Sequence, residues 1–244
     1  MGNALHQQGH TIQQVYSRTF KKAKALAKQI DAKATNNLKK INPSAQLYLL
    51  AVSDGAIVEV ATKIASTLSS AALVVHTSGA TPAKSLSPFF KSYGTFYPLQ
   101  SFSKGKAVDF SSIPFCIHAN RKKQREQLAS LAKCLSPAVY FLDDQQRAIL
   151  HVAAVFANNF TNHLFHISQS LLQGQSLPFE LLQPLILETA AKVQAQSPSA
   201  MQTGPAIRGD QKTIEQHLSY LKKQPEIQKL YLLLTESIQS NHSK

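Results

Sequence analysis

The sequence predicts a doubly wound α/β domain built on a parallel sheet, followed by an all-α domain. Up to about Asp143, short apolar runs alternate with helical patterns, which is typical of a parallel sheet with helices on both faces. After Asp143 the strand patterns stop and four long helical stretches follow. A chain of 244 residues, 43% of them hydrophobic, can form one large domain or two ordinary ones. The expected domains are residues 1–143 and 144–244.

The chain begins inside a strand–helix–strand unit. Ala4 and Leu5 continue a helical face, and Gly9 stands where the end of a helix favours a positive φ. The run from Thr11 to Tyr16 contains β-branched residues, so a strand should follow this helix. The first strand of the sheet, and the turn that would join it to the helix, are expected to be missing from this sequence.

Short apolar runs bounded by turn residues predict the strands, and longer amphipathic runs predict the helices. The predicted strands are 11–16, 32–35, 47–52, 72–76, 94–98, 114–117 and 138–142. In the first domain, helices are predicted over 21–30, 55–67 and 121–134, with Asp54 as the N-cap of the second. In the second domain they are predicted over 145–172, 179–195, 211–221 and 226–239, and Asp210 is a candidate N-cap.

Composition argues against a membrane or secreted protein. No run reaches the roughly 18 apolar residues that span a bilayer, and residues 1–10 lack the pattern of a signal peptide. Cys116 and Cys134 form neither a disulfide framework nor a zinc motif, so both are interpreted as buried thiols. We expect a cytoplasmic protein.

The net charge of +13 raises the possibility of nucleic-acid binding, but its distribution argues against it. Lysines crowd residues 21–40, where Asp31 is the only acid, and such a run is usually a solvated helix face. No aromatic side chains alternate with these lysines as a base-stacking platform would require. Nucleic acid is therefore not an expected partner.

Four predicted strands end in polar or small residues, and ligands of doubly wound sheets bind beyond the carboxyl ends of the strands. Arg18, between two hydroxyl residues, suits the 2′-phosphate of NADP, where an acidic residue would select NAD. A surface arginine is the alternative. The candidate cofactor-binding residues are Ser17, Arg18, Thr19, Ala51, Val52, Ser53, Thr77, Ser78 and Gly79, and the candidate substrate-binding residues at the next strand end are Tyr97 and Gln100.

A second candidate lies in the helix after Arg147, which contains no charged residue before Glu180. At about 100° per residue, one polar stripe forms opposite an apolar face. The stripe consists of His151, Asn158, Asn162 and His166, and the apolar face of Ile149, Phe156, Phe160, Ile167 and Leu171. Two interpretations remain open. Either His151, Asn158 and Asn162 are catalytic residues that orient the substrate and move a proton, or they form a hydrogen-bonded seam inside a helical dimer.

Six segments, in this order and spacing, resemble one bacterial family over nearly the whole chain: "HTIQQVYSRT", "LYLLAVSDGAI", "VVHTSGA", "YGTFYPLQSFS", "VYFLDDQQRAILHVAAVFANNFTNHLF" and "QTGPAIRGD". It is the Rossmann-like oxidoreductase family with a C-terminal domain of unknown function, similar to pyrroline-5-carboxylate reductase and deazaflavin-dependent NADP oxidoreductases. The resemblance implies an NAD(P)-binding domain and a helical domain that forms a homodimer. Apolar faces carrying Leu164, Leu171, Leu181 and Ile186 would be buried in that dimer.

The sequence departs from the family's pattern at two places. The opening strand and the glycine-rich turn that would hold the pyrophosphate are missing, so either the gene model starts at an internal methionine or this site has been lost. We expect the chain as written to bind NADP weakly for that reason. A lysine that related dehydrogenases place one turn before an asparagine is replaced by Ala154. Arg208, in the family-typical loop, is expected to pair across a dimer or to bind a substrate carboxylate.

These observations predict an NADP-dependent oxidoreductase that transfers a hydride between the nicotinamide and a small imine, ketone or hydroxy compound in the cleft between the domains. The substrate itself is not predicted. The alternative is a non-catalytic nucleotide-sensing or scaffold protein that retains the fold. His163 and His166 lack the carboxylate or cysteine that a metal site would need, so no metal is expected.

Overall fold

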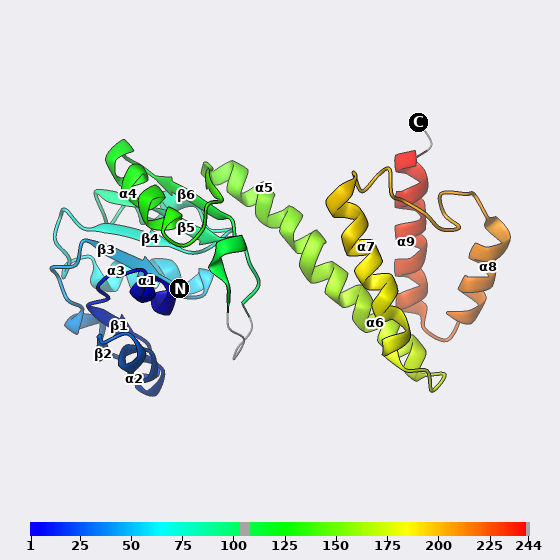
Figure 1. The fold of residues 1–244 in the computed structure, drawn as a ribbon, viewed down its shortest axis with the longest axis horizontal. Coiled ribbons are helices and arrows are strands. Elements are labelled where there is room, and N and C mark those ends of the chain that lie inside the picture. The colour runs from blue at the N-terminus through cyan, green and yellow to red at the C-terminus, as the bar shows by residue number, and fades with distance from the viewer. Residues whose placement is uncertain (103–107, 243–244) are drawn as a thin grey trace. The chain divides into compact units, whose positions relative to one another are not determined.

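The computed structural model describes residues 1–102 and 108–242, and the chain divides into two compact units, Met1–Ala157 and Asn158–Lys244 (Figure 1). In the first unit, β1 (Gln14–Tyr16) pairs with β2 (Lys33–Thr35) in a two-stranded parallel sheet. A second sheet has five strands in the order β3-β4-β5-β6-β7. These strands are β3 (Leu47–Leu50), β4 (Leu73–His76), β5 (Ser92–Pro98), β6 (Phe115–Ala119) and β7 (Val139–Phe141).

The predicted parallel sheet is confirmed except at one pair of strands. β3, β4 and β5 run parallel, as do β6 and β7, but β5 and β6 are antiparallel. Parallel strands need a crossover, usually a helix, and the described part of the β5–β6 connection holds only the 3₁₀ turn η4 (Phe110–Ser112). The two strands also approach closely, since a Cβ on Gly94 would collide with the His118 carbonyl oxygen.

Apolar side chains of the five-stranded sheet alternate between two cores, which confirms the doubly wound α/β class. Val75 and Phe96 pack with Leu128 of α4 (Lys122–Lys133), whereas Val74 packs with Ile57 and Ile64 of α3 (Ile57–Ile64). Because successive side chains of a strand point to opposite faces, both faces of the sheet are covered by helices. The remaining helices of this unit are α1 (Gly2–Gln7), α2 (Phe20–Gln29), η1 (Leu38–Lys40), η2 (Asp54–Ala56), η3 (Ala83–Leu86) and α5 (Asp144–Ala154).

Two local predictions in the first unit are wrong, and one is confirmed. Asp54 is not the N-cap of α3, because it begins the 3₁₀ turn η2 and the helix starts only at Ile57. Cys134 is exposed at the end of α4, while Cys116 is buried, and burial raises the pKa of the Cys116 thiol to about 11. Gly9 has the predicted positive φ, at 81°.

The second unit is helical, as predicted. The single helix predicted over 145–172 is interrupted after α5 by a π-helical turn (Val155–Phe160), after which α6 runs over Thr161–Gln173. The other helices are η6 (Phe179–Leu182), α7 (Gln183–Ala195), α8 (Gln211–Tyr220) and α9 (Pro225–His242). Asp210 caps α8, since its carboxylate accepts a hydrogen bond from the Thr213 amide at 3.1 Å. Within residues 1–102 and 108–242, no helix combines the length and the apolar character needed to cross a membrane.

Candidate functional site

The residues after β1 form a short turn that leads into α2. The Ser17 hydroxyl accepts a hydrogen bond from the Thr19 amide at 3.3 Å, and Thr19 occupies the N-cap position of the helix. Arg18, between them, is exposed. After β3, Val52 packs against the core beside α3, and Ala51 and Ser53 are exposed. Both groups of predicted cofactor-binding residues therefore lie at the carboxyl ends of strands of the first unit.

The loop after β4 is held in one conformation by hydrogen bonds within it. The buried imidazole of His76 accepts a hydrogen bond from the Ser78 amide through Nδ1, at 3.2 Å. The Ser78 hydroxyl accepts from the amides of Ala80 (3.2 Å) and Thr81 (2.8 Å) and donates to the Thr81 hydroxyl (3.1 Å). Burial, with a smaller effect of Arg147, lowers the pKa of His76 to about 4, so this ring is neutral at neutral pH.

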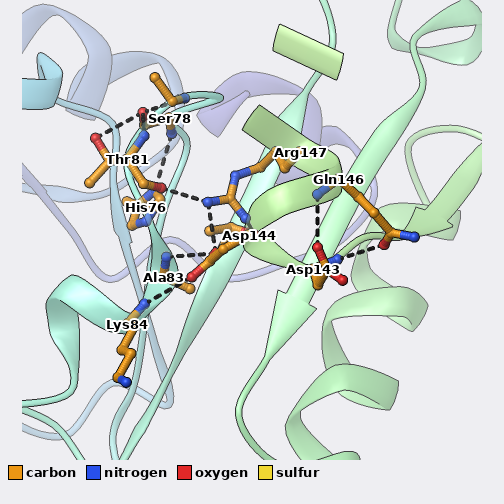
Figure 2. A network of polar contacts seen from close by, with 11 residues as sticks. His76, Ser78, Thr81, Ala83, Lys84, Asp143, Asp144, Gln146 and Arg147 are labelled. Atoms are coloured by element: carbon orange, nitrogen blue, oxygen red, sulfur yellow. Dashed lines mark hydrogen bonds and ion pairs between the residues drawn. The ribbon is translucent and has the colours of Figure 1, made fainter. Parts of the chain in front are cut away.

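An ion pair between the buried Arg147 and the half-buried Asp144 fastens this loop to the start of α5 (Figure 2). The Arg147 guanidinium contacts the Asp144 carboxylate at 2.8 Å and donates to the Thr81 carbonyl at 2.6 Å and to the Thr95 hydroxyl at 3.4 Å. Burial acts to raise the pKa of Asp144, but the Ala83 amide and Arg147 outweigh it and hold that pKa below its ordinary value. The Asp144 carboxylate is therefore charged at neutral pH.

One turn after Arg147, His151 meets Tyr97 of β5 and Gly79 of the loop. The Tyr97 hydroxyl lies 3.4 Å from His151 Nδ1, and the two rings meet edge to face. A Cβ on Gly79 would lie 2.6 Å from His151 Nδ1 and 2.9 Å from Tyr97 Cζ. Only glycine therefore lets both rings approach the loop this closely. Burial raises the pKa of Tyr97, so its hydroxyl keeps its proton at neutral pH.

Of the residues predicted from the sequence, the structure brings His151, Tyr97 and Gly79 together and places Ser78 beside them. Gln100 is exposed, and its side chain accepts a hydrogen bond from the Ser101 amide at 2.8 Å. Asn158, Asn162 and Arg208 are exposed residues of the second unit. Asn162 lines a groove of about 670 Å³ between α6 and α7, whose other lining residues are Phe165, His166, Gln169, Phe179, Gln183, Ile186 and Leu187.

Sequence reasoning missed the polar residues that support this site, which are the buried His76, Thr95 and Arg147 and the half-buried Thr81 and Asp144. A weak signal was present, because Asp144, Arg147 and His151 are spaced at i, i+3 and i+7, which places them on one helix face. The polar stripe predicted from the sequence begins only after Arg147, so it includes neither Asp144 nor Arg147. The polar stripe predicted along the helix also assumed a regular turn, and the π turn changes the spacing between His151 and Asn162.

Comparisons with known proteins agree with the fold of both units. The model of a Rossmann-like domain matches residues 1–99, and that of a domain of unknown function (DUF2520) matches residues 113–238. A candidate NADP oxidoreductase from Bacteroides fragilis is 43% identical, with 98% of this chain and 92% of that chain covered and a TM-score of 0.91. A search of curated proteins finds no match.

Two more distant structures share the fold. A reductive aminase from Aspergillus terreus, in complex with NADPH and ethyl levulinate, is 16% identical, with coverage of 99% and 89% and a TM-score of 0.71. A pyrroline-5-carboxylate reductase from Coxiella burnetii is 14% identical, with coverage of 99% and 92% and a TM-score of 0.57. The resemblance drawn from the sequence motifs is thereby confirmed.

Proposed function

The chain belongs to the family defined by the domain of unknown function DUF2520, behind a Rossmann-like domain, and on this premise we propose that it is an NADP-dependent oxidoreductase of a small-molecule substrate. The observation that carries the proposal is the meeting of Tyr97, His151 and Gly79 beyond β4 and β5, where ligands of Rossmann-like sheets bind. The likeness to the Bacteroides fragilis protein along 98% of the chain supports the same conclusion.

The residues at the strand ends fit the two halves of such a cofactor. Arg18 is exposed between the Ser17 and Thr19 hydroxyls, so it offers a guanidinium and two hydroxyls to a 2′-phosphate. Val52 and Ser53 follow the next parallel strand. Thr77, Ser78 and Gly79 would contact the nicotinamide half, since they follow the carboxyl end of β4 beside the Tyr97–His151 pair. When bound, the cofactor supplies or accepts the hydride.

Tyr97 and His151 would handle the proton of the reaction. In the reductive direction, the Tyr97 hydroxyl donates its proton to the oxygen or nitrogen that gains charge, and His151, through Nδ1, returns a proton to the phenolate. His151 is then reprotonated from solvent. The imine, ketone or hydroxy compound thus gains or loses one hydride and one proton, which suits a small neutral substrate. We further propose that the active form is a homodimer through the helical unit.

The NADP preference can be tested at Arg18. Arg18→Glu should weaken NADP+ by about 1.5–3 kcal/mol, the range for hydrogen bonds to charged groups, and should change NAD+ binding little. Calorimetric titration of both nucleotides measures this, and Lys22→Glu, at an exposed lysine of α2, is the matched control. Equal losses for the two nucleotides would contradict the proposal.

Turnover separates the oxidoreductase from a nucleotide-sensing protein. With NADPH and a panel of cyclic imines and aliphatic ketones, Tyr97→Phe and His151→Gln should lower kcat and leave the Kd for NADPH within about twofold, since neither is assigned to the phosphates. A protein that binds NADPH tightly and reduces no member of the panel would instead favour the sensing role.

A further inference from the structure

Arg147 is more deeply buried than stability alone explains, whereas its partner Asp144 keeps 30% of its side chain exposed. The Arg147 side chain is 1% exposed, and its Nε has no hydrogen-bond partner in the described structure. Removing charges from water costs several kcal/mol per ion, and apolar residues of similar volume often replace a buried pair without loss of stability. A pair retained at this position therefore calls for a role in placing other groups.

The partners of the pair all belong to the loop after β4 or lie beside it (Figure 2). Arg147 binds the Thr81 carbonyl, and Asp144 accepts hydrogen bonds from the amides of Ala83 at 2.8 Å and Lys84 at 3.4 Å. Thr81 is tied in turn to Ser78 by two hydrogen bonds. The segment from Ser78 to Lys84 is thus fixed to the first turn of α5 by two oppositely charged side chains.

The same loop and helix meet again at Gly79 and His151. These two residues are packed so tightly that even a single methyl group would not fit between them. The Tyr97 hydroxyl and His151 Nδ1 are 3.4 Å apart, which is already long for a hydrogen bond. A small shift of α5 away from the loop would therefore break this contact. Arg147 itself reaches neither Tyr97 nor His151 by any hydrogen bond that the structure records. Its effect on them passes through the loop and the helix.

We propose that Arg147 and Asp144 form a clamp that sets the spacing between the Thr77–Gly79 loop and His151, and so keeps the Tyr97–His151 pair assembled at the nicotinamide site. Both are positioning residues. The part of this inference that concerns the nicotinamide rests on the proposed function, whereas the clamp itself can be tested without cofactor. Since a misplacement of about 1 Å can cost on the order of 100-fold in rate, a loss of the clamp would reach the chemistry.

The chain provides a matched control beside the clamp. Asp143 is the N-cap of α5, where its carboxylate accepts from the Gln146 amide at 2.8 Å in a capping box. Asp143→Asn and Asp144→Asn remove the same charge one residue apart. Asparagine is as good an N-cap as aspartate, so only the second change should release the loop. Arg147→Lys, which keeps the charge and loses the forked geometry, is a second clamp variant in case one of them folds poorly.

The ¹⁵N spectrum of the His151 imidazole is the first measurement, with Tyr97→Phe as the reference for a broken pair. Asp144→Asn and Arg147→Lys should both move the His151 signals toward that reference, and Asp143→Asn should not. Amide exchange at Ala83 and Lys84 should rise by at least about tenfold in Asp144→Asn, as expected when a hydrogen bond to a charged group is lost. Unchanged His151 signals and exchange rates in Asp144→Asn would overturn the clamp.

Kinetics with NADPH and a cyclic imine form the second measurement. Asp144→Asn should lower kcat by on the order of 100-fold and leave the KM for NADPH within about twofold, because the clamp positions groups and does not hold the phosphates. A rise in KM with kcat unchanged would contradict that role. If the unaltered protein does not bind NADPH while Asp144→Asn still loses the His151–Tyr97 signals, the proposed function fails and the clamp stands.

Discussion

His76 makes the first unit sensitive to acid. Its ring is fully buried, and its pKa in the folded protein is about 4, below the ordinary value of 6.5. Between these two pH values the unfolded chain binds a proton that the folded chain does not. The free energy of unfolding therefore has its full value above pH 6.5 and falls as the pH drops toward 4, by about 3 kcal/mol in total.

His76→Asn should remove most of this acid sensitivity, because the amide oxygen can still accept from the Ser78 amide but does not titrate. Urea unfolding at pH 7 and pH 4.5 measures the effect in both proteins. His6→Asn, at an exposed histidine of α1, is the control and should leave the pH dependence as it is. An equal loss of stability in His76→Asn and the unaltered protein would assign the acid sensitivity to other groups.

Gly79 is the second single residue on which the site depends. In Gly79→Ala the new methyl group would push His151 and Tyr97 away from the loop, with a loss of about 1–3 kcal/mol of stability, as for other overpacked positions. Gly55→Ala is the control, since no atom lies within 4 Å of its added Cβ. Adding His151→Ala should recover most of the loss, and urea unfolding of the single and double variants measures this coupling. Strictly additive losses would mean that the two residues do not compete for space.

Sequence patterns pointed to the proposed ligand-binding residues more readily than to the residues that support them. Tyr97 and Gly79 follow from the rule that ligands bind at the carboxyl ends of strands, which requires only the strand boundaries. Arg147 stands between a glutamine and an alanine, where an arginine is normally solvated. Its burial is produced by the loop through Thr81, and such a contact across 66 residues leaves no local pattern in the sequence.

Strands and helices were predicted well, because the period of apolar residues reports local geometry directly. Two features of these elements were not. The antiparallel pairing of β5 and β6 depends on the connection between the strands, which the strand pattern does not contain. The π turn at 155–160 has no recognisable composition, so a long uncharged stretch was interpreted as one regular helix.

The π turn itself can be tested by deleting one of its residues. Deletion of Ala157 should convert the turn to regular α-helix and leave Asn162 at nearly its present angle around the axis, because a π turn holds about one residue more than the α-helical turn that replaces it. We expect helix content and thermal stability to be kept, because α-helical hydrogen bonding replaces a rarer form. The rate of NADPH-dependent reduction should therefore stay within about tenfold of that of the unaltered protein, because Asn162 keeps its place.

Circular dichroism, a thermal melt and the imine-reduction assay check this prediction together. Ala157→Ser keeps the length of the chain and is the control, since residue 157 is exposed. A fall in rate on the order of 100-fold with the helix content kept would show that the turn itself is part of the catalytic arrangement, and a loss of helix content would contradict the replacement of the turn by regular α-helix.

The described part of the molecule exposes many large apolar side chains, several of them in the second unit. In the second unit Leu181 is 61% exposed and Leu187 70%, and Leu185 and Leu233 are similarly open. Exposed apolar patches of this kind mark interaction surfaces. The predicted interface residues Leu164 and Leu181 are exposed, whereas Leu171 and Ile186 are half-buried. The face around α7 is therefore the part of the helical unit that most needs a covering partner.

We expect a second copy to cover that face, and sedimentation velocity at about 10 μM should then give twice the chain mass of 26.8 kDa. Leu187→Glu should shift the protein to monomer, because a carboxylate would have to be buried without a partner. Gln194→Glu adds the same charge at an exposed polar position of α7 and should leave the dimer intact. A monomer in the unaltered protein would contradict the dimer. The groove that Asn162 lines would then be open to solvent, and a ligand, not a second chain, would have to account for its amide and apolar lining.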